Sequence, residues 1–177
     1  NSKNIIKETN SAFLVEGQMD FLMCWQVGVK NVVATSGTAL TGDHLRLLRR
    51  VCDELLLSFD SDEAGSTAME RAIDLAESSD FNVKIVLLSD VKDPAEAVQK
   101  DPNILREGIK NARPAAQFYF EKYLPKSGLL DYSRRDELRA LRTVLTKLKA
   151  IASPVARGFW VSELSRRTGV AEKILLE

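Results

Sequence analysis

Four short aliphatic runs alternate with helical patterns in the first half of this chain, and this alternation constrains the fold more than any other feature. Each run is too short for a buried helix and is bounded by Gly, Asp or Ser, as is typical of buried strands. The runs cover residues 12–15, 31–34, 55–59 and 83–88, and helical spacing lies between them at residues 18–27, 41–51 and 63–79. This order predicts an α/β fold with a parallel sheet, right-handed crossovers and flanking helices.

The helix expected over residues 63–79 has an alanine-rich face. Ala64, Ala68, Ala72, Leu75 and Ala76 follow helical spacing beside a charged face. This is the pattern of an amphipathic helix that packs on one side.

After Pro114 the pattern changes to helices alone. Residues 115–124, 136–151 and 159–167 have helical periodicity, and turn-forming residues at 125–128 and at Ser153-Pro154 separate them. We therefore predict two parts, an α/β domain at residues 1–112 and a small all-helical subdomain at residues 113–177.

Charge is divided in the same way, although the net charge of the whole chain is zero. Up to Ala112 there are 12 Lys and Arg against 18 Asp and Glu, and from Arg113 onward there are 13 against 7. An acidic part with a net charge of −6 and a basic part with +6 suggest two jobs or two partners, unless both are solvated faces.

Several classes of protein are disfavoured by composition. Cys24 and Cys52 have no partner at metal-ligand spacing, and His44 is the only histidine, so we expect buried thiols and no zinc site. No apolar run reaches the length of a membrane span, and the start is not a secretory signal. The absence of an initiator Met indicates a piece of a longer protein.

Acidic residues follow three of the four expected strands. Glu16 comes directly after the first, Asp60 and Asp62 after the third, and Asp90 and Asp93 after the fourth. In an open parallel sheet, ligands bind beyond the carboxyl ends of the strands, where these acids converge. Crowded carboxylates repel one another unless a cation neutralises them, and hard oxygen ligands favour Mg²⁺ over zinc.

Each of these acidic residues also has a simpler, purely structural interpretation. An Asp-x-Asp often caps a helix, and Asp62 is placed to cap the helix that begins at Glu63.

After the second strand, Ser36, Gly37 and Thr38 offer backbone N–H groups and hydroxyls to a phosphate at the same edge. Taken together, the residues point to a Mg²⁺-dependent phosphoryl-transfer or phosphodiester site, and the chemistry alone leads no further.

Four motifs in order resemble the Toprim family, and within it the bacterial DnaG-type primases. Residues 13–20, Phe-Leu-Val-Glu-Gly-Gln-Met-Asp, are similar to the family's Val-Glu-Gly-Tyr-Met-Asp signature. Residues 34–41, Ala-Thr-Ser-Gly-Thr-Ala-Leu-Thr, are similar to its Gly-Thr-Ala-Leu-Thr, and His44 follows as in that family. Residues 60–65, Asp-Ser-Asp-Glu-Ala-Gly, resemble Asp-Gly-Asp-x-Ala-Gly, and Lys92-Asp93-Pro94 resembles the start of Asp-Pro-Asp.

The resemblance implies a fragment of a DNA primase, which makes RNA primers by Mg²⁺-dependent nucleotidyl transfer, with Mn²⁺ able to substitute. Glu16 would be a general base or metal ligand, and Asp60, Asp62 and Asp93 would hold the metal. Lys92, together with the loop after the second strand, would contact nucleotide phosphates. The implied partners are a single-stranded DNA template, ribonucleoside triphosphates and, through a domain not present here, the replicative helicase. The implied location is the cytoplasm, in the bacterial replisome.

The chain departs from the family pattern at three positions. Gln18 replaces Tyr, which we expect to be a surface change, and Ser61 replaces Gly in a turn. Ala95 replaces the last Asp of Asp-Pro-Asp, which removes a carboxylate, and Glu96 would point about 100° away on a helix. Asp90 or water could fill the weakened metal position.

Three residues of the motifs are expected to be structural. Asp20 and Gly65 should cap or pack helices, and His44 should make a structural hydrogen bond. In the basic tail, Arg134, Arg135, Arg139 and Arg142 lie on or before one expected helix, either as contacts to a nucleic-acid backbone or as a solvated face.

Two other functions stay open. A topoisomerase or nuclease of the Toprim family would use the same acids, but a topoisomerase needs a nucleophilic Tyr, and Tyr119, Tyr123 and Tyr132 all lie in the helical tail. A non-catalytic nucleic-acid-binding or protein-binding module is the third possibility, indicated by Ala95. Under the primase interpretation, the 177 residues alone should not make primers.

Overall fold

The computed structural model describes residues 2–60, 62–126, 130–131 and 133–176, which form two compact units. The first unit is Asn1–Pro114 and the second is Ala115–Glu177. The predicted turn at residues 125–128 lies only partly within the described residues. No described helix has both the length and the apolar character needed to cross a membrane.

The first unit is built on a five-stranded sheet with the strand order β2-β1-β3-β4-β5. The four predicted strands are present, parallel to one another, and β5 is added antiparallel to β4. Their bounds are β1 Ser11–Val15, β2 Val32–Ala34, β3 Glu54–Leu57, β4 Asn82–Ile85 and β5 Arg113–Pro114.

Strand β5 was not predicted because two residues are too few to show a pattern. It lies at the edge of the sheet, where proline is tolerated since no further strand requires its missing N–H. Pairing with β4 attaches Arg113 and Pro114 to the first unit, which ends at Pro114.

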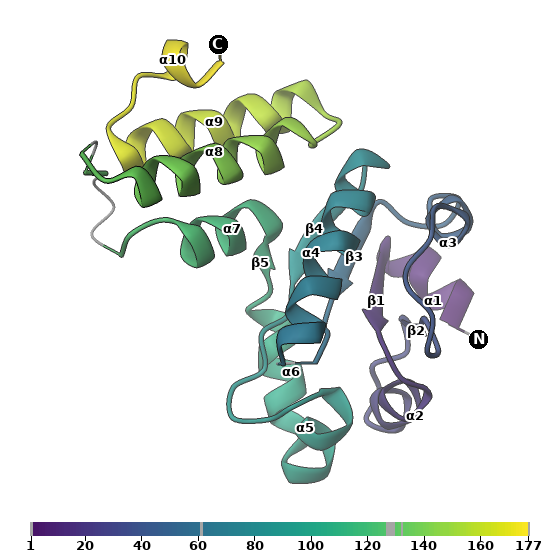
Figure 1. The fold of residues 1–177 in the computed structure, drawn as a ribbon. Coiled ribbons are helices and arrows are strands. Elements are labelled where there is room, and N and C mark those ends of the chain that lie inside the picture. The colour runs from purple at the N-terminus through teal and green to yellow at the C-terminus, as the bar shows by residue number, and fades with distance from the viewer. Residues whose placement is uncertain (1, 61, 127–129, 132, 177) are drawn as a thin grey trace. The chain divides into compact units, whose positions relative to one another are not determined.

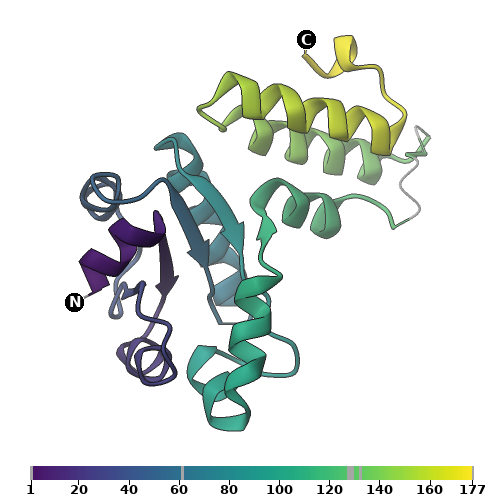
Figure 2. The ribbon, with the colours of Figure 1, turned by 180° about the vertical axis from the view of Figure 1, so that it is seen from behind.

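Six helices accompany this sheet within the described part of the first unit. They are α1 Ser2–Thr9, α2 Gln18–Gln26, α3 Gly42–Leu48, α4 Glu63–Ser78, α5 Pro94–Lys100 and α6 Pro102–Lys110. Figures 1 and 2 show α4 on one face of the sheet and α5 and α6 on the other. Helices α5 and α6 each begin with proline after a capping aspartate, Asp93 and Asp101, a standard start signal.

Burial of both sheet faces explains the aliphatic runs. All five residues of β1 are buried. Phe13 pairs with Leu56 across β1 and β3, and both belong to one hydrophobic cluster with Cys24 and Leu105. A parallel sheet covered on both sides needs apolar residues at consecutive positions, not at alternate ones.

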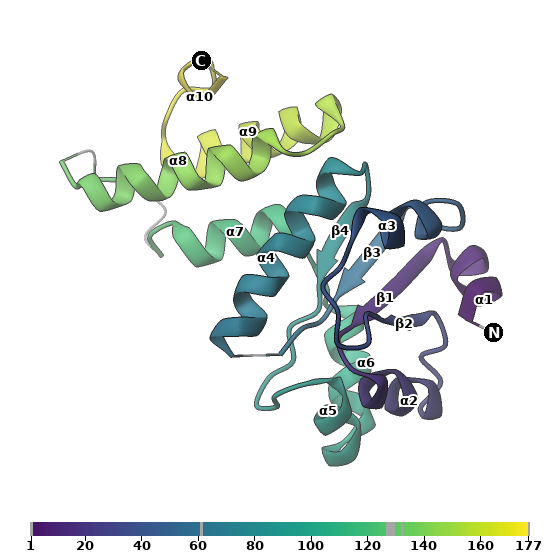
Figure 3. The same ribbon diagram turned by 45° about the vertical axis from the view of Figure 1, so that its right-hand side comes forward.

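The buried face of helix α4 only partly overlaps its alanine pattern. Its buried residues are Gly65, Met69, Ala72, Ile73 and Ala76, whereas Ala64 and Ala68 are exposed. Larger side chains remove more apolar surface from water than alanine does, so Met69 and Ile73 determine which side packs. Figure 3 shows α4 alongside β3 and β4.

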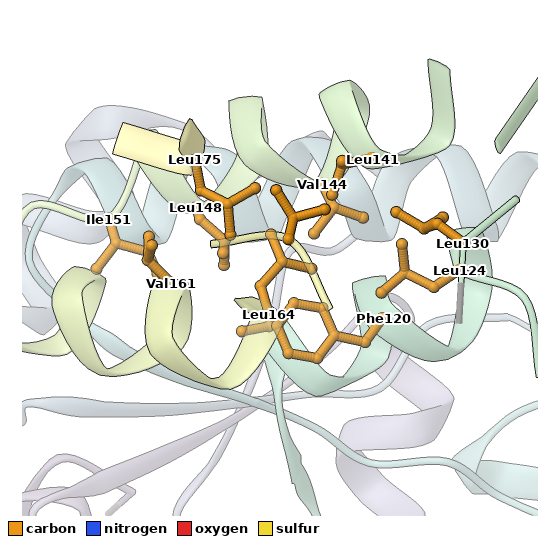
Figure 4. Close-up of a cluster of buried hydrophobic side chains, with 12 residues drawn as sticks. Phe120, Leu124, Leu130, Leu141, Val144, Leu148, Ile151, Val161, Leu164 and Leu175 are labelled. Carbon is orange, nitrogen blue, oxygen red and sulfur yellow. The ribbon is translucent and has the colours of Figure 1, made fainter. Parts of the chain in front are cut away.

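The second unit is helical, as predicted. Its helices are α7 Ala115–Tyr123, α8 Arg135–Lys149, α9 Pro154–Thr168 and α10 Glu172–Leu176. Figure 4 shows side chains from all four, among them Phe120, Leu148, Leu164 and Leu175, meeting in one core. Helix α9 begins five residues earlier than predicted, because Ser153 accepts a hydrogen bond from the Ala156 N–H and Pro154 begins the first turn.

Gly65→Ala should destabilise the first unit. A Cβ at this position would lie 2.2 Å from the carbonyl oxygen of Asp60, so helix α4 or the preceding loop must move. We expect a loss of roughly 1–3 kcal/mol in the free energy of unfolding, the usual cost of overpacking. Urea denaturation of the purified chain measures it.

Gly158→Ala is the matched control. Gly158 lies inside α9 and a Cβ there would meet nothing within 4 Å, so alanine should stabilise the helix by about 0.5–1 kcal/mol. Equal effects of the two substitutions would contradict the close contact between Gly65 and Asp60.

Candidate functional site

The carboxyl edge of the sheet brings two of the predicted acids into direct contact. Strands β1 and β3 are neighbours and parallel, so Glu16, directly after β1, and Asp60, three residues after β3, leave the sheet side by side. The backbone N–H of Asp60 donates to Glu16 Oε1 at 3.2 Å. This bond joins segments that are 44 residues apart.

Asp62 and Asp93 are both helix caps. Asp62 Oδ1 accepts from the Gly65 N–H at 2.7 Å, and Asp93 Oδ1 accepts from the Glu96 N–H at 2.7 Å. The interpretation of Asp62 as a cap is therefore confirmed. One carboxylate oxygen is enough for a cap. The second oxygen of each side chain carries no hydrogen bond to a described residue.

Asp20 links the two ends of the acidic edge. Its side chain is buried, with Oδ2 accepting from the Gly17 N–H and Oδ1 from the Ala95 N–H, both at 3.0 Å. The structural role expected for Asp20 is confirmed. Sequence spacing shows the near contact, in which Asp20 reaches back to the N–H of the helix-capping Gly17, but not the contact with Ala95, 75 residues away.

Gln18, which replaces Tyr, and Glu96, which follows the replacement Ala95, both make hydrogen bonds beside this edge. The exposed Gln18 donates from Nε2 to Ser36 Oγ at 2.7 Å, so it also connects two motifs. Glu96 Oε2 accepts from the Lys92 N–H at 2.6 Å, which turns its carboxylate toward the loop before α5. Ser61 lies outside the described residues.

Burial and mutual repulsion raise the pKa of three acids above their ordinary values. Burial raises the pKa of Glu16, the Asp60 N–H partly offsets it, and Asp60, Asp20 and Asp62 raise it further. The pKa of Asp60 is raised by burial and by Asp93 and Asp62. Burial also raises the pKa of Asp20, to which Asp93 and Asp60 add. The acids that follow β1, β3 and β4 therefore share one electrostatic field.

Lys92 is the positive charge at this edge. Its Nζ lies 3.8 Å from Asp60 Oδ2 and opposes the rise in the Asp60 pKa. The lysine side chain is 62% exposed, so the contact is screened and contributes little to stability. Its position places an ammonium group beside the acids, at the surface.

The acids are neighbours but do not form a finished metal site. Across the described residues, no group of three or more His, Cys, Asp or Glu side chains is arranged to hold an ion. One oxygen each of Asp62 and Asp93 is used in capping, and both oxygens of Asp20 are used. Asp90 lines a separate polar cavity of about 850 Å³ with residues of α6.

The predicted phosphate loop lies next to Glu16, with most of its backbone donors in use. The Ser36 N–H donates to the Glu16 carbonyl at 2.9 Å, and the Thr38 N–H donates to the Thr35 carbonyl at 3.4 Å. Ser36 and Gly37 both have positive φ, 58° and 81°, which turns the chain sharply after β2. Of the backbone donors in this turn, only that of Gly37 has no described acceptor.

His44 and Gly65 have the structural roles that were expected. His44 Nδ1 accepts from the Thr41 N–H, and Thr41 Oγ1 accepts from the His44 N–H, which closes the first turn of α3. Gly65 provides the close approach of α4 to Asp60.

The three tyrosines and the four arginines predicted to contact a nucleic-acid backbone belong to the second unit. Tyr119 is buried and Tyr123 packs against the helical core, whereas Tyr132 lies outside the described residues. Arg134 precedes α8 and pairs with Asp136 at 2.6 Å and with Glu137. The other predicted backbone contacts, Arg135, Arg139 and Arg142, are exposed on α8.

Comparison with known proteins agrees with this geometry. A family described as Toprim-like matches residues 13–98, from β1 into α5. The DNA primase of Clostridium acetobutylicum is 30% identical over 176 residues, which are 99% of this chain and 29% of that protein. This chain therefore spans less than a third of the length of that relative.

Solved structures of primases have the same fold. The zinc-binding and RNA polymerase domains of the Aquifex aeolicus primase match with a TM-score of 0.81 and 31% identity, over 99% of this chain and 41% of that one. A DnaG primase catalytic domain bound to ssDNA matches with a TM-score of 0.81 and 26% identity, over 98% of this chain and 56% of that one. The chain belongs to the family of bacterial DnaG-type DNA primases, and it comprises the Toprim core of their catalytic domain with the helices that follow.

Proposed function

We propose that this chain supplies the acidic, metal-binding part of a template-directed RNA primer synthesis by nucleotidyl transfer. The observation that carries the proposal is the hydrogen bond from the Asp60 N–H to Glu16 Oε1, which brings the two best-matched Toprim motifs to one point. Membership of the primase family supports a polymerase-type nucleotidyltransferase over other reactions on phosphodiesters.

The donors at this edge fit a Mg²⁺ ion, with Mn²⁺ as a substitute. They are carboxylates without His or Cys, as hard cations prefer. Burial, and after it repulsion from neighbouring acids, raises the pKa of Glu16 and of Asp60, and a cation would oppose both effects. Glu16, Asp60 and Asp62 would hold the ion, with Asp93 beside them. When bound, the metal lowers the pKa of the attacking 3′-hydroxyl and neutralises charge on the triphosphate.

The protein groups around the acids have separate roles in the proposal. Glu16, whose pKa is raised by burial, is the candidate general base for the hydroxyl proton. Lys92 and the turn of Ser36, Gly37 and Thr38 face the triphosphate from two sides of the acids. Asp20 holds the segments after Glu16 and Asp93 together and touches no substrate.

We infer the substrates and partners from the primase relatives. A DnaG primase catalytic domain was solved bound to ssDNA, which supports a single-stranded DNA template here. Ribonucleoside triphosphates are the co-substrates, and the replicative helicase is the partner through a domain outside this chain, in the bacterial cytoplasm. Polymerisation needs template, primer end and nucleotide held together, so the 177 residues alone should not make primers.

One observation favours a non-catalytic module as the second candidate. Ala95 removes a carboxylate, and its N–H is occupied by Asp20. A module of this kind has no need to bind a divalent ion, which separates the two candidates. A topoisomerase is supported less, because Tyr119 is buried.

Crystals of the chain soaked in Mn²⁺ should show anomalous density within coordination distance of Glu16, Asp60 and Asp62. The reason is that the ion replaces their mutual repulsion by attraction. Asp60→Asn should lose most of this density, whereas Asp43→Asn, an exposed carboxylate on α3, should keep it. Density at other acids alone would contradict the proposed centre.

Asp62 can be tested by a pair of substitutions that separate capping from repulsion. Asp62→Asn keeps a good N-cap and removes a charge, so the metal-free protein should melt slightly higher while Mn²⁺ binding weakens. Asp62→Ala also removes the cap and should lower the free energy of unfolding by about 1 kcal/mol. Thermal melts with and without Mn²⁺ measure both. Asparagine and alanine variants that melt alike would show that the cap contributes nothing.

Primer synthesis can be measured in a chimera in which this chain replaces the matching segment of the C. acetobutylicum primase. We expect template-dependent oligonucleotides from the chimera and none from the chain alone. Asp60→Asn in the chimera should reduce the rate by about 100-fold or more, as losses of electrostatic transition-state stabilisation do. Asp43→Asn is the control. An undiminished rate with Asp60→Asn would exclude the proposed role, and primers from the chain alone would show that its substrate surface is complete.

A further inference from the structure

Helix α8 carries a row of positive side chains on the side away from the core of the second unit. At about 100° per residue they fall within an arc of about 80°, and their Cα atoms extend over about 21 Å of helix. The row consists of Arg135, Arg139, Arg142 and Lys149, all exposed. The buried residues of α8, Leu141, Val144 and Leu148, lie on the opposite side.

Three other arginines of this unit, unlike the members of the row, have acidic partners. Arg166 and Arg167 both bind Glu163, at 2.6 and 3.1 Å. Arg134 binds Asp136 and Glu137. Among the residues that the structure describes, no carboxylate pairs with any member of the row.

Helix stability does not explain such a row. Like charges three or four residues apart destabilise a helix by about 0.2–0.5 kcal/mol per pair, and Arg135, Arg139 and Arg142 make two such pairs. Only Lys149, in the last turn, gains from the helix dipole. Since the four side chains are exposed, packing of the core does not require them either.

We propose that this row, Arg135, Arg139, Arg142 and Lys149, binds the phosphodiester backbone of a nucleic acid. The proposal rests on the proposed function, because it takes the strand to be that of primer synthesis. Guanidinium groups bind phosphate oxygens in a bidentate fork, and a row of four follows a strand along the helix. None of the four contacts a described aromatic ring, so this side of α8 offers no aromatic surface on which bases could stack, and we assign the row to the backbone.

This set differs from the one expected from the sequence. Arg134 is excluded, since Asp136 and Glu137 already neutralise it. Lys149 is added, since 14 residues bring it back to the same side of the helix as Arg135. The second unit, Ala115–Glu177, has 12 Lys and Arg against 7 Asp and Glu, a net charge of +5 that attracts a polyanion to it.

The test is the salt dependence of binding to a fluorescein-labelled, single-stranded oligothymidylate, measured by anisotropy in EDTA. Four contacts predict a slope of log K against log salt concentration of about −3, since each contact to a single strand contributes about −0.7. The double variant Arg139→Ala/Arg142→Ala should weaken binding at low salt and reduce the slope by about 1.4. Alanine favours helix, so α8 should form, and circular dichroism checks this.

The matched control removes the same charge elsewhere in the second unit. Arg166→Ala/Lys173→Ala loses two exposed positive side chains on α9 and α10, and its slope should stay close to that of the unsubstituted chain. A second arm replaces the oligothymidylate by an RNA–DNA hybrid. If the row variant loses more affinity for the single strand than for the hybrid, the row binds the template strand. If it loses more affinity for the hybrid, the row binds the primer–template product.

Two outcomes would overturn the proposal. One is equal binding by the row variant and the control variant, or no binding of nucleic acid at all. The other is row-dependent binding of polyglutamate without row-dependent binding of DNA, which would assign the row to an acidic protein. Because EDTA removes divalent ions, a failure of the proposed metal centre leaves this assay unchanged, and the Mn²⁺ soak does not involve α8.

Discussion

The parallel pairing of β1 with β3 is the constraint on which the acidic edge depends. Leu14 pairs with Leu57, so the two chains leave the sheet together and the Asp60 N–H reaches Glu16 Oε1. A shift of one residue would turn every side chain of β1 to the other face of the sheet. Both faces are packed, so the apolar core that fixes this register also fixes the distance between the two motifs.

Backbone N–H groups, not a bound ion, hold the acids in the metal-free protein. Asp62 and Asp93 cap helices, and the buried Asp20 accepts from Gly17 and Ala95. Each cap of this kind stabilises a helix by about 1 kcal/mol, which offsets part of the repulsion between the carboxylates. Burial, and after it repulsion from neighbouring acids, still raises the pKa values of Glu16 and Asp60. These two side chains therefore have the most to gain from a cation.

The second unit has a positive net charge, and its positive side chains fall into two groups. The arginines of this unit that form ion pairs have their acidic partner close by in the sequence, as Arg166 has Glu163. The exposed side of α8 has cations without such neighbours. A chain with zero net charge thus separates a carboxylate edge suited to a cation from a helix face suited to a polyanion, each within its own unit.

The sequence by itself determined the elements that depend on local patterns. Aliphatic runs gave the four parallel strands, periodicity gave α2, α3, α4 and the helical second unit, and the motifs identified the family and the placement of acids after strands. Tertiary structure alone decided the contacts between distant segments: the bond from Ala95 to Asp20, the approach of Lys92 to Asp60 and the two-residue strand β5. It also decided which side of α4 is buried and which arginines stay unpaired. The physical reason is that propensity and periodicity act over a few residues, whereas these contacts depend on the packing of segments far apart in the chain.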